Sequence, residues 1–192
     1  MSRGFGALLA VVGVLVLVVL MIFGSYVSAQ RQMVAKDQAV KSTWSEVDVQ
    51  LERRADLIPN LVETVKGFTK EESSVYGEIA QAREGLMNAQ TPQAKIAANG
   101  QLDGAMVKFL ALTENYPQLR SSEQFMRLQD ELAGTENRIA VARKRYNDAI
   151  QDYNTFILQF PNSIWAGVAG FHQNPAYFTA SPASQAVPNV KF

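Results

Sequence analysis

Hydrophobic and polar positions follow three different patterns along this 192-residue chain. Residues 4–24 contain no charge, residues 31–152 carry 34 of the 36 charged side chains, and residues 153–190 again carry none. An unbroken apolar run is typical of a membrane helix, and a mixed stretch is typical of amphipathic elements. We therefore expect a transmembrane anchor at 1–27, a helical bundle at 28–162 and an uncharged tail at 163–192.

The first part has the length of a helix that crosses a bilayer. As a helix, residues 4–24 would extend about 31 Å, close to the roughly 30 Å hydrocarbon core. Val27-Ser28-Ala29 has the small side chains of a leader cleavage site, but the apolar run exceeds the ~7–15 residues of a leader's core. The pattern favours an uncleaved anchor over a cleaved leader. We expect these residues to span the lipid bilayer: Phe5, Leu9, Val12, Leu15, Leu20 and Phe23.

Basic residues flank this anchor on both sides. Arg3 precedes it, whereas Arg31, Lys36 and Lys41 follow it. Flanking basic residues favour the cytoplasmic side, although long soluble domains cross membranes largely regardless of loop charge. We expect the soluble part on the cytoplasmic side.

Apolar residues of the middle part recur every three or four positions, as on one face of a helix. Four such stripes start near Val40, Val75, Ala98 and Phe125, and no stretch alternates as a strand would. The last stripe has the seven-residue period of a coiled coil, in Phe125, Leu132, Ile139, Tyr146, Tyr153 and Phe160. The predicted fold class is all-α, with an N-terminal transmembrane helix that runs into an elongated antiparallel four-helix bundle or coiled coil.

Local signals predict where these helices bend, begin and end. Pro59 should kink or restart the first helix. Thr91-Pro92 has an N-cap residue followed by proline at the first helical position. Ser121-Ser-Glu-Gln124 has the spacing of a capping box, and Pro161 should end the last helix.

Composition argues against most classes of catalytic site. The chain has no cysteine and a single histidine, His172, which leaves no thiol chemistry and no pair of Glu-x-x-His motifs for a di-metal bundle. Its 18 basic and 18 acidic residues balance, whereas nucleic-acid binders carry a basic excess. We expect no enzyme, no cofactor, no metal and no nucleic-acid partner.

Charged residues also occur on or beside the apolar stripes. A buried arginine is costly unless a carboxylate pairs with it. Such a pair can fix the register of packed helices, and the alternative is a polar ligand site inside the bundle. The buried polar candidates are Arg54, Glu72, Glu114 and Glu136.

The uncharged segment 153–190 contains seven aromatic residues and four of the chain's seven prolines. Disordered tails are generally charged and poor in aromatics, so we expect part of it to pack, with its end from residue 180 loose. It packs either on its own bundle, or against a neighbouring subunit or the membrane surface. The interface candidates, which include a Tyr-Asn pair repeated one heptad apart, are Tyr146, Asn147, Tyr153, Asn154, Trp165, Phe171, Tyr177 and Phe178.

Several distinctive segments occur in the chain: 53–62 (RRADLIPNLV), 114–119 (ENYPQL), 135–143 (TENRIAVAR), the two Tyr-Asn pairs and 160–162 (FPN). Taken together, they resemble the bacterial LemA family, over about residues 5–178. The resemblance implies a helical bundle anchored in the bacterial inner membrane and supplies no reaction. It marks as structural determinants Arg54, Asp56, Pro59, Glu114, Pro117, Glu136, Arg143 and Asn147.

Two functions fit this pattern. The first is a structural or interaction protein that self-assembles as a homo-oligomer through its long helices and its tail. The second is a sensor or ligand-binding module that signals through the continuous membrane helix. The second requires a polar cavity near Arg54 and the Tyr-Asn pairs.

Overall fold

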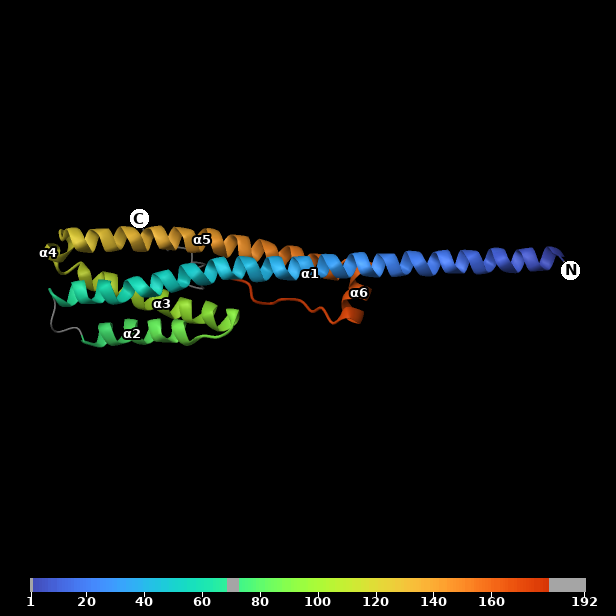
Figure 1. Ribbon diagram of the computed structural model, residues 1–192. Coiled ribbons are helices and arrows are strands. Elements are labelled where there is room, and N and C mark those ends of the chain that lie inside the picture. Colours follow the sequence, from blue (N-terminus) through green and yellow to red (C-terminus); the bar gives the residue numbers. More distant parts are fainter. Residues whose placement is uncertain (1, 69–72, 180–192) are drawn as a thin grey trace, which may run out of the picture. The chain divides into compact units, whose positions relative to one another are not determined.

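The computed structural model describes residues 2–68 and 73–179, which form six α-helices and no strand (Figure 1). This confirms the all-α prediction. The helices are α1 Ser2–Lys66, α2 Ser73–Asn88, α3 Pro92–Thr113, α4 Pro117–Arg120, α5 Glu123–Leu158 and α6 Asn162–Ala169. The described residues fall into two compact units. We call residues 42–147 with 175–179 the bundle unit, and residues 2–41 with 148–174 the anchor unit.

The bundle unit is an antiparallel bundle of four helical segments: the last part of α1, all of α2 and α3, and the first part of α5. Between α1 and α5, residue 46 pairs with 145 and residue 54 with 136, so these helices run in opposite directions. Between α1 and α3, residue 48 pairs with 95 and residue 54 with 103, so these helices run in the same direction. Helix α2 runs against α3, since residue 76 contacts 109 and residue 78 contacts 108.

The apolar stripes that the spacing predicts form the core of this bundle. Burial of these side chains is the main favourable contribution to the packing of amphipathic helices. The fully buried residues include Val47, Leu51, Ile58, Leu61, Ile79, Leu102, Phe109, Phe125, Ile139 and Tyr146.

Helix α1 continues through Pro59 and does not restart there. Proline lacks an N–H and so leaves the carbonyl four residues earlier, that of Ala55, without its helical donor. In the structure Nε of Arg83, from α2, donates to the Ala55 oxygen at 2.7 Å. A tertiary contact thus satisfies the carbonyl that the sequence pattern leaves open.

Of three other local predictions, the N-cap of α3 is confirmed, whereas the N-cap of α5 and the end of the heptad differ from the structure. The Thr91 side chain caps α3 by accepting from the Ala94 N–H, as the sequence predicts. The Ser121 hydroxyl does not cap α5 but donates back to the carbonyls of Pro117 and Gln118 in α4. Phe160 continues the heptad spacing, but α5 ends at Leu158, two residues before it, and Phe160 is 82% exposed.

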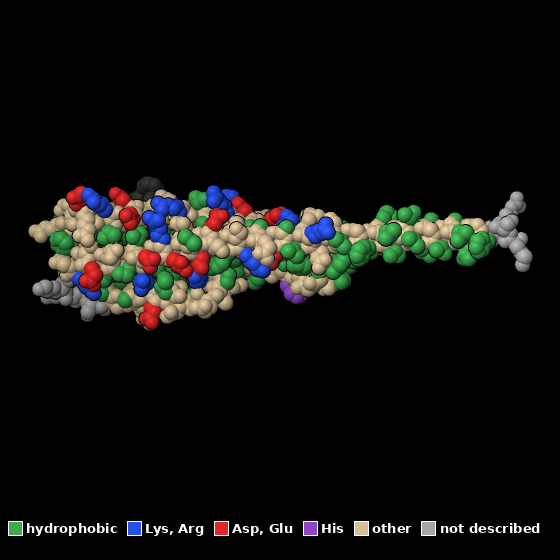
Figure 2. Space-filling view, viewed as in Figure 1, with side chains coloured by type: hydrophobic (Ala, Val, Ile, Leu, Met, Phe, Trp, Pro, Cys, Tyr) green, Lys and Arg blue, Asp and Glu red, His purple; other side chains and the backbone are tan. Residues whose placement is uncertain are grey.

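The anchor unit contains the apolar first part of α1, the last part of α5, and α6. Figure 2 shows hydrophobic side chains covering the N-terminal part of α1, whereas charged side chains are dense on the helices of the bundle unit. This part of α1 is long and apolar enough to cross a membrane, and none of its most apolar window is buried. The residues predicted to span the bilayer are all exposed: Phe5, Leu9, Val12, Leu15, Leu20 and Phe23.

Candidate functional site

A buried arginine lies at the centre of the bundle unit, between α1, α3 and α5. Arg54 is 8% exposed, and its Nη1 lies 2.5 Å from Asp103 Oδ1 and 3.1 Å from Glu136 Oε2. Asn99 Oδ1 accepts from the same nitrogen at 3.3 Å, and the Asn99 amide also donates to Asp103 at 3.0 Å. We call these four residues the Arg54 cluster.

The structure brings together only part of the set of buried polar candidates. Glu136 lies beside Arg54, although its side chain is 44% exposed rather than buried. Glu114 is exposed and forms the C-cap of α3, not the buried position that the sequence predicts, because the helix ends at Thr113. Glu72 lies outside the described residues.

Sequence analysis missed Asp103 and Asn99 as partners of Arg54. The available signal was their spacing of one helical turn, beside Leu102 on the buried stripe of α3. Polar residues flanking an apolar stripe are common, so spacing alone does not show that these two face an arginine on another helix.

A second arginine neutralises the Arg54 cluster. The guanidinium nitrogens of Arg143 lie 3.9 Å from both Asp103 and Glu136, beyond hydrogen-bond distance. The same guanidinium lies 5.1 Å from the centre of the Phe178 ring, within cation–π range. Two positive and two negative groups therefore balance, as a buried charge requires.

The Arg54 cluster forms the polar end of a cleft of about 450 Å³ between α3 and α5. The side chains of Asp103 and Glu136 are 41% and 44% exposed, although the Glu136 Oε2 atom that faces Arg54 is buried. Its apolar walls come from Met106, Val107, Leu110, Leu132 and Ala133. Such a cleft suits a ligand with an apolar body and a cationic or hydrogen-bonding end.

The first Tyr-Asn pair holds the tail segment of the bundle unit. The Asn147 amide donates to the Phe178 carbonyl at 2.8 Å and accepts from the Phe178 N–H at 2.9 Å. The Phe178 ring stacks on Trp44 at 6.2 Å and meets the Tyr146 ring edge-on at 5.9 Å. These contacts show packing of the tail on its own chain, one of the two alternatives that the sequence left open.

The second Tyr-Asn pair makes matching contacts inside the anchor unit. The Asn154 amide both donates to and accepts from the backbone of Asn174, each at 2.8 Å, and the Tyr153 hydroxyl donates to the His172 carbonyl at 2.9 Å. Burial raises the pKa of the Tyr153 hydroxyl, and the carboxylate of Asp37 raises it further. In each Tyr-Asn pair, the asparagine amide therefore binds the backbone of a single tail residue, Phe178 or Asn174.

The remaining interface candidates have separate places. Trp165 packs edge-on against Tyr26, with ring centres 5.6 Å apart. Phe171 is half-buried, and its N–H donates to the Ala166 carbonyl at the end of α6. Tyr177 is half-buried, and its N–H donates to the Pro175 carbonyl.

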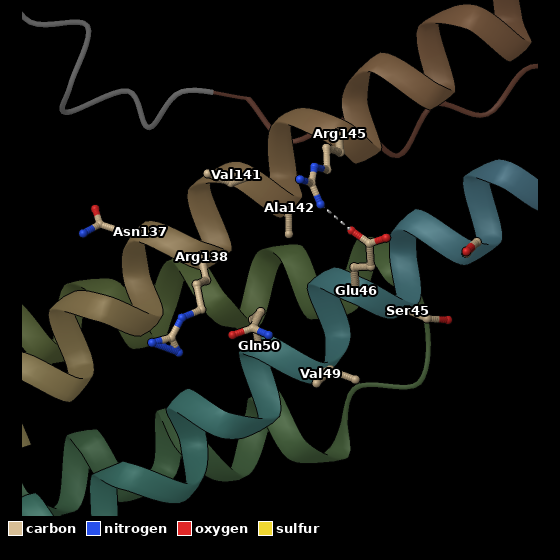
Figure 3. Close-up of a pocket in the computed structure, with 10 residues that line it drawn as sticks. Ser45, Glu46, Val49, Gln50, Asn137, Arg138, Val141, Ala142 and Arg145 are labelled. Carbon is tan, nitrogen blue, oxygen red and sulfur yellow. Dashed lines mark hydrogen bonds and ion pairs between the residues drawn. The ribbon is translucent and has the colours of Figure 1, made fainter.

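An open groove of about 770 Å³ lies between α1 and α5 in the bundle unit (Figure 3). An ion pair between Arg145 and Glu46, at 3.3 Å, crosses it. Val49 and Val141 line it and are both more than half exposed. Among residues 2–68 and 73–179, no group of three or more acidic or histidine side chains is arranged to hold a metal ion.

Comparisons with known proteins place these features in a family. Curated relatives include magnetosome protein MamQ of Magnetospirillum gryphiswaldense, 26% identical over 214 residues that cover 95% of this chain and 76% of the relative. Magnetosome protein MamQ 1 of Paramagnetospirillum magneticum is 25% identical over 206 residues, which cover 94% and 75%. Protein LemA of Metamycoplasma hominis is 21% identical over 157 residues, which cover 81% and 71%.

The sequence profile of the LemA family matches residues 43–192. The matched range contains the Arg54 cluster, the cleft beside it and both Tyr-Asn pairs. The apolar first part of α1 precedes that range. By this match, which covers well over half of its length, the chain belongs to the LemA family.

Proposed function

We propose that this protein is a membrane-anchored, non-enzymatic scaffold or interaction protein that self-associates through its long helices. The observation that carries the proposal is the first part of α1, where every described side chain from Phe5 to Phe23 is exposed. Soluble proteins rarely expose contiguous apolar surface of this extent, and a helix of this length and composition is stable across a bilayer.

The chemistry of the bundle unit supports a structural role. The charges of the Arg54 cluster are balanced once Arg143 is included, and the asparagines of both Tyr-Asn pairs are engaged with backbone. Side chains committed to such contacts position helices and the tail. They are not arranged as a nucleophile with its base.

Self-association needs a surface that the chain itself leaves open. The heptad residues of α5, including Ile139 and Tyr146, are buried within the chain. The groove between α1 and α5 is open, and its small and apolar residues Ser45, Val49 and Val141 would let helices of a second copy approach closely. The groove is therefore the surface that we assign to contacts between copies.

The mass of the detergent-extracted full chain tests this assignment. Light scattering should give an oligomer for the unmodified chain and a smaller particle for the double variant Val49→Glu/Val141→Glu, because desolvated carboxylates oppose contact. Val107→Glu, at an exposed valine of α3, is the matched control and should leave the mass unchanged. A monomeric unmodified chain would contradict self-association, and release from membranes by alkaline carbonate would contradict the anchor.

We place the bundle on the cytoplasmic side of the bacterial inner membrane, because three basic residues follow the anchor within 17 residues of Gly24. The absence of native cysteine makes a direct test possible. Ser121→Cys, at an exposed position, should resist a membrane-impermeant maleimide in intact spheroplasts and react after lysis. Reaction before lysis would place the bundle on the other side.

The cleft beside Arg54 favours a second candidate function, a ligand-binding sensor that signals through α1. Its partly exposed acidic side chains, Asp103 and Glu136, and its apolar walls suit a primary alkylamine, which serves as a probe. Adding hexylamine should shift the Met106 methyl resonance in the unmodified chain and not in Asp103→Asn. An unmoved Met106 signal would count against a sensor of this type.

A further inference from the structure

Helix α6 exposes an apolar patch that nothing in the anchor unit covers. Ile164 is 52% exposed and Val168 is 70% exposed, and these residues lie one turn apart on the same face of α6. Phe160, just before α6, is 82% exposed. We call these three residues the α6 patch. The flanking sequence is uncharged, because no Lys, Arg, Asp or Glu occurs between Tyr153 and Val190.

The other face of α6 fixes it against α1, beside which Figure 1 draws it. Ala166 is buried. Trp165 meets Tyr26 of α1 edge-on, a favourable aromatic geometry. Gly170 ends the helix in the left-handed conformation, with φ of 75°, so the chain turns away directly after the patch. The Tyr26–Trp165 contact thus fixes α6 beside Tyr26 along the axis of α1.

Tyr26 lies just beyond the end of the apolar span of α1. Tyr26 follows Gly24 by two residues, which is about 3 Å along a helix, and no charge occurs from Ser25 to Gln30. Arg31, the first charged residue after the span, is exposed and lies about 7.5 Å beyond Tyr26. An apolar span, then Tyr and Trp, then a basic residue is the order in which side chains meet hydrocarbon, the interface and lipid headgroups.

We propose that α6 is an interfacial helix whose patch of Phe160, Ile164 and Val168 inserts into the headgroup region of the bilayer that α1 crosses. This inference rests on the proposed anchor and adds a second membrane contact to it. Amphipathic segments of this kind bury their apolar face about 5–10 Å into the boundary between headgroups and acyl chains. Continuity with the span, through the Tyr26–Trp165 contact, favours lipid over a second protein as the occupant.

Fluorescence quenching by nitroxide lipids tests the inference on the full chain. Because the chain has no cysteine, single substitutions can be labelled with the polarity-sensitive dye NBD in vesicles of phosphatidylcholine and phosphatidylglycerol. Val168→Cys reports on the patch, and Leu15→Cys reports on the span. Val107→Cys is the matched control, since both valines are 70% exposed and Val107 lies in the bundle unit.

The expected result differs at each position. NBD at residue 168 should emit at shorter wavelength in vesicles and be quenched by nitroxides near the headgroup more than by nitroxides near the acyl-chain end. NBD at residue 15 should show the opposite preference, and NBD at residue 107 should not be quenched. Adding Phe160→Ser and Ile164→Ser to the Val168→Cys chain should weaken the quenching at residue 168 and leave that at residue 15 unchanged.

Each other outcome would contradict either the interfacial helix or the membrane anchor. Quenching at residue 15 without quenching at 168 rejects the interfacial helix and keeps the anchor. A residue-168 signal that is insensitive to lipid but changes when unlabelled chain is added shows that a second copy covers the patch, and it also rejects the inference. Loss of quenching at both positions rejects the anchor together with the inference.

Discussion

Arg83 supplies to α1 the hydrogen bond that Pro59 removes. The Arg83 Nε donates to the Ala55 carbonyl, four residues before Pro59, at 2.7 Å. The two residues lie on different helices, yet they complete one backbone interaction. A proline inside a helix usually weakens it by about 3 kcal/mol, and part of that destabilisation comes from the unsatisfied carbonyl.

This relationship predicts that Arg83 and Pro59 are energetically coupled. Arg83→Met should lower the free energy of unfolding by about 1–2 kcal/mol, since a hydrogen bond from a charged donor is lost. In a Pro59→Ala background the same substitution should cost about 1 kcal/mol less, because the introduced alanine supplies a backbone N–H to the Ala55 carbonyl. Urea unfolding in detergent, followed by circular dichroism, measures all four chains. Equal costs in both backgrounds would show that the contact does not replace the helical bond.

The Arg54 cluster predicts a large difference between two neighbouring arginines. Arg54→Met keeps much of the volume but leaves the more distant Arg143, at 3.9 Å, to balance both Asp103 and Glu136. Because those carboxylates are partly exposed, we expect a loss of about 2 kcal/mol rather than the larger penalty of a fully buried pair. Arg53→Met, at the exposed neighbouring position, should change stability by less than about 0.5 kcal/mol.

Thermal unfolding of the two variants checks this prediction, and a second substitution sharpens it. Adding Asp103→Asn to Arg54→Met leaves one carboxylate, Glu136, opposite Arg143 and should recover part of the lost stability. If the two single variants melt together, the Arg54 cluster does not contribute to the cohesion of the bundle.

The contact between Asn147 and Phe178 predicts how tightly the tail is held. Asn147→Asp keeps an acceptor for the Phe178 N–H but places a carboxylate oxygen against the Phe178 carbonyl. The tail should separate more often, and hydrogen exchange of the 171–179 segment should be about tenfold faster, which corresponds to about 1.4 kcal/mol. Asn137→Asp, an exposed asparagine on the same helix, is the control and should leave the exchange of that segment unchanged.

The helical core could be predicted from the sequence because packed helices place apolar residues at a regular spacing. Leu51, Leu102 and Ile139 recur with their neighbours every three or four residues, and all three are buried. The apolar span could also be predicted from the sequence, since the thickness of the bilayer sets its length.

Contacts between segments that are distant in the sequence could not be predicted, because no regular spacing of residues indicates them. Asp103 joins Arg54, and Arg83 joins Ala55, only because the bundle brings separate helices together. Phe160 continues the heptad but is exposed, because α5 ends two residues before it and periodicity does not report where a helix stops. The Tyr-Asn pairs were recognised as a repeat, but a side chain that binds backbone leaves no pattern in the residues it binds.

The raised pKa of Tyr153 predicts how the anchor unit responds to alkaline pH. Burial is the larger cause and the Asp37 carboxylate the smaller, and both disfavour the tyrosinate. In the unfolded chain the hydroxyl ionises near its ordinary pKa of about 10. Above that pH the unfolded state binds fewer protons than the folded state, so the free energy of unfolding falls as pH rises. The contribution of Tyr153 is therefore complete below about pH 10 and is lost as pH climbs through the folded-state pKa.

Tyrosinate absorbance at 295 nm measures this directly for the six tyrosines of the chain. Tyr153→Phe should remove one component that titrates above the ordinary tyrosine range and should flatten the alkaline loss of stability. It should also weaken the folded state at neutral pH by about 1 kcal/mol, because the hydrogen bond to the His172 carbonyl disappears. Asp37→Asn should move the same component only slightly toward lower pH, since burial remains. A Tyr153→Phe curve that matches the unmodified chain would mean that the hydroxyl is solvated and that the tail at His172 is not held by it.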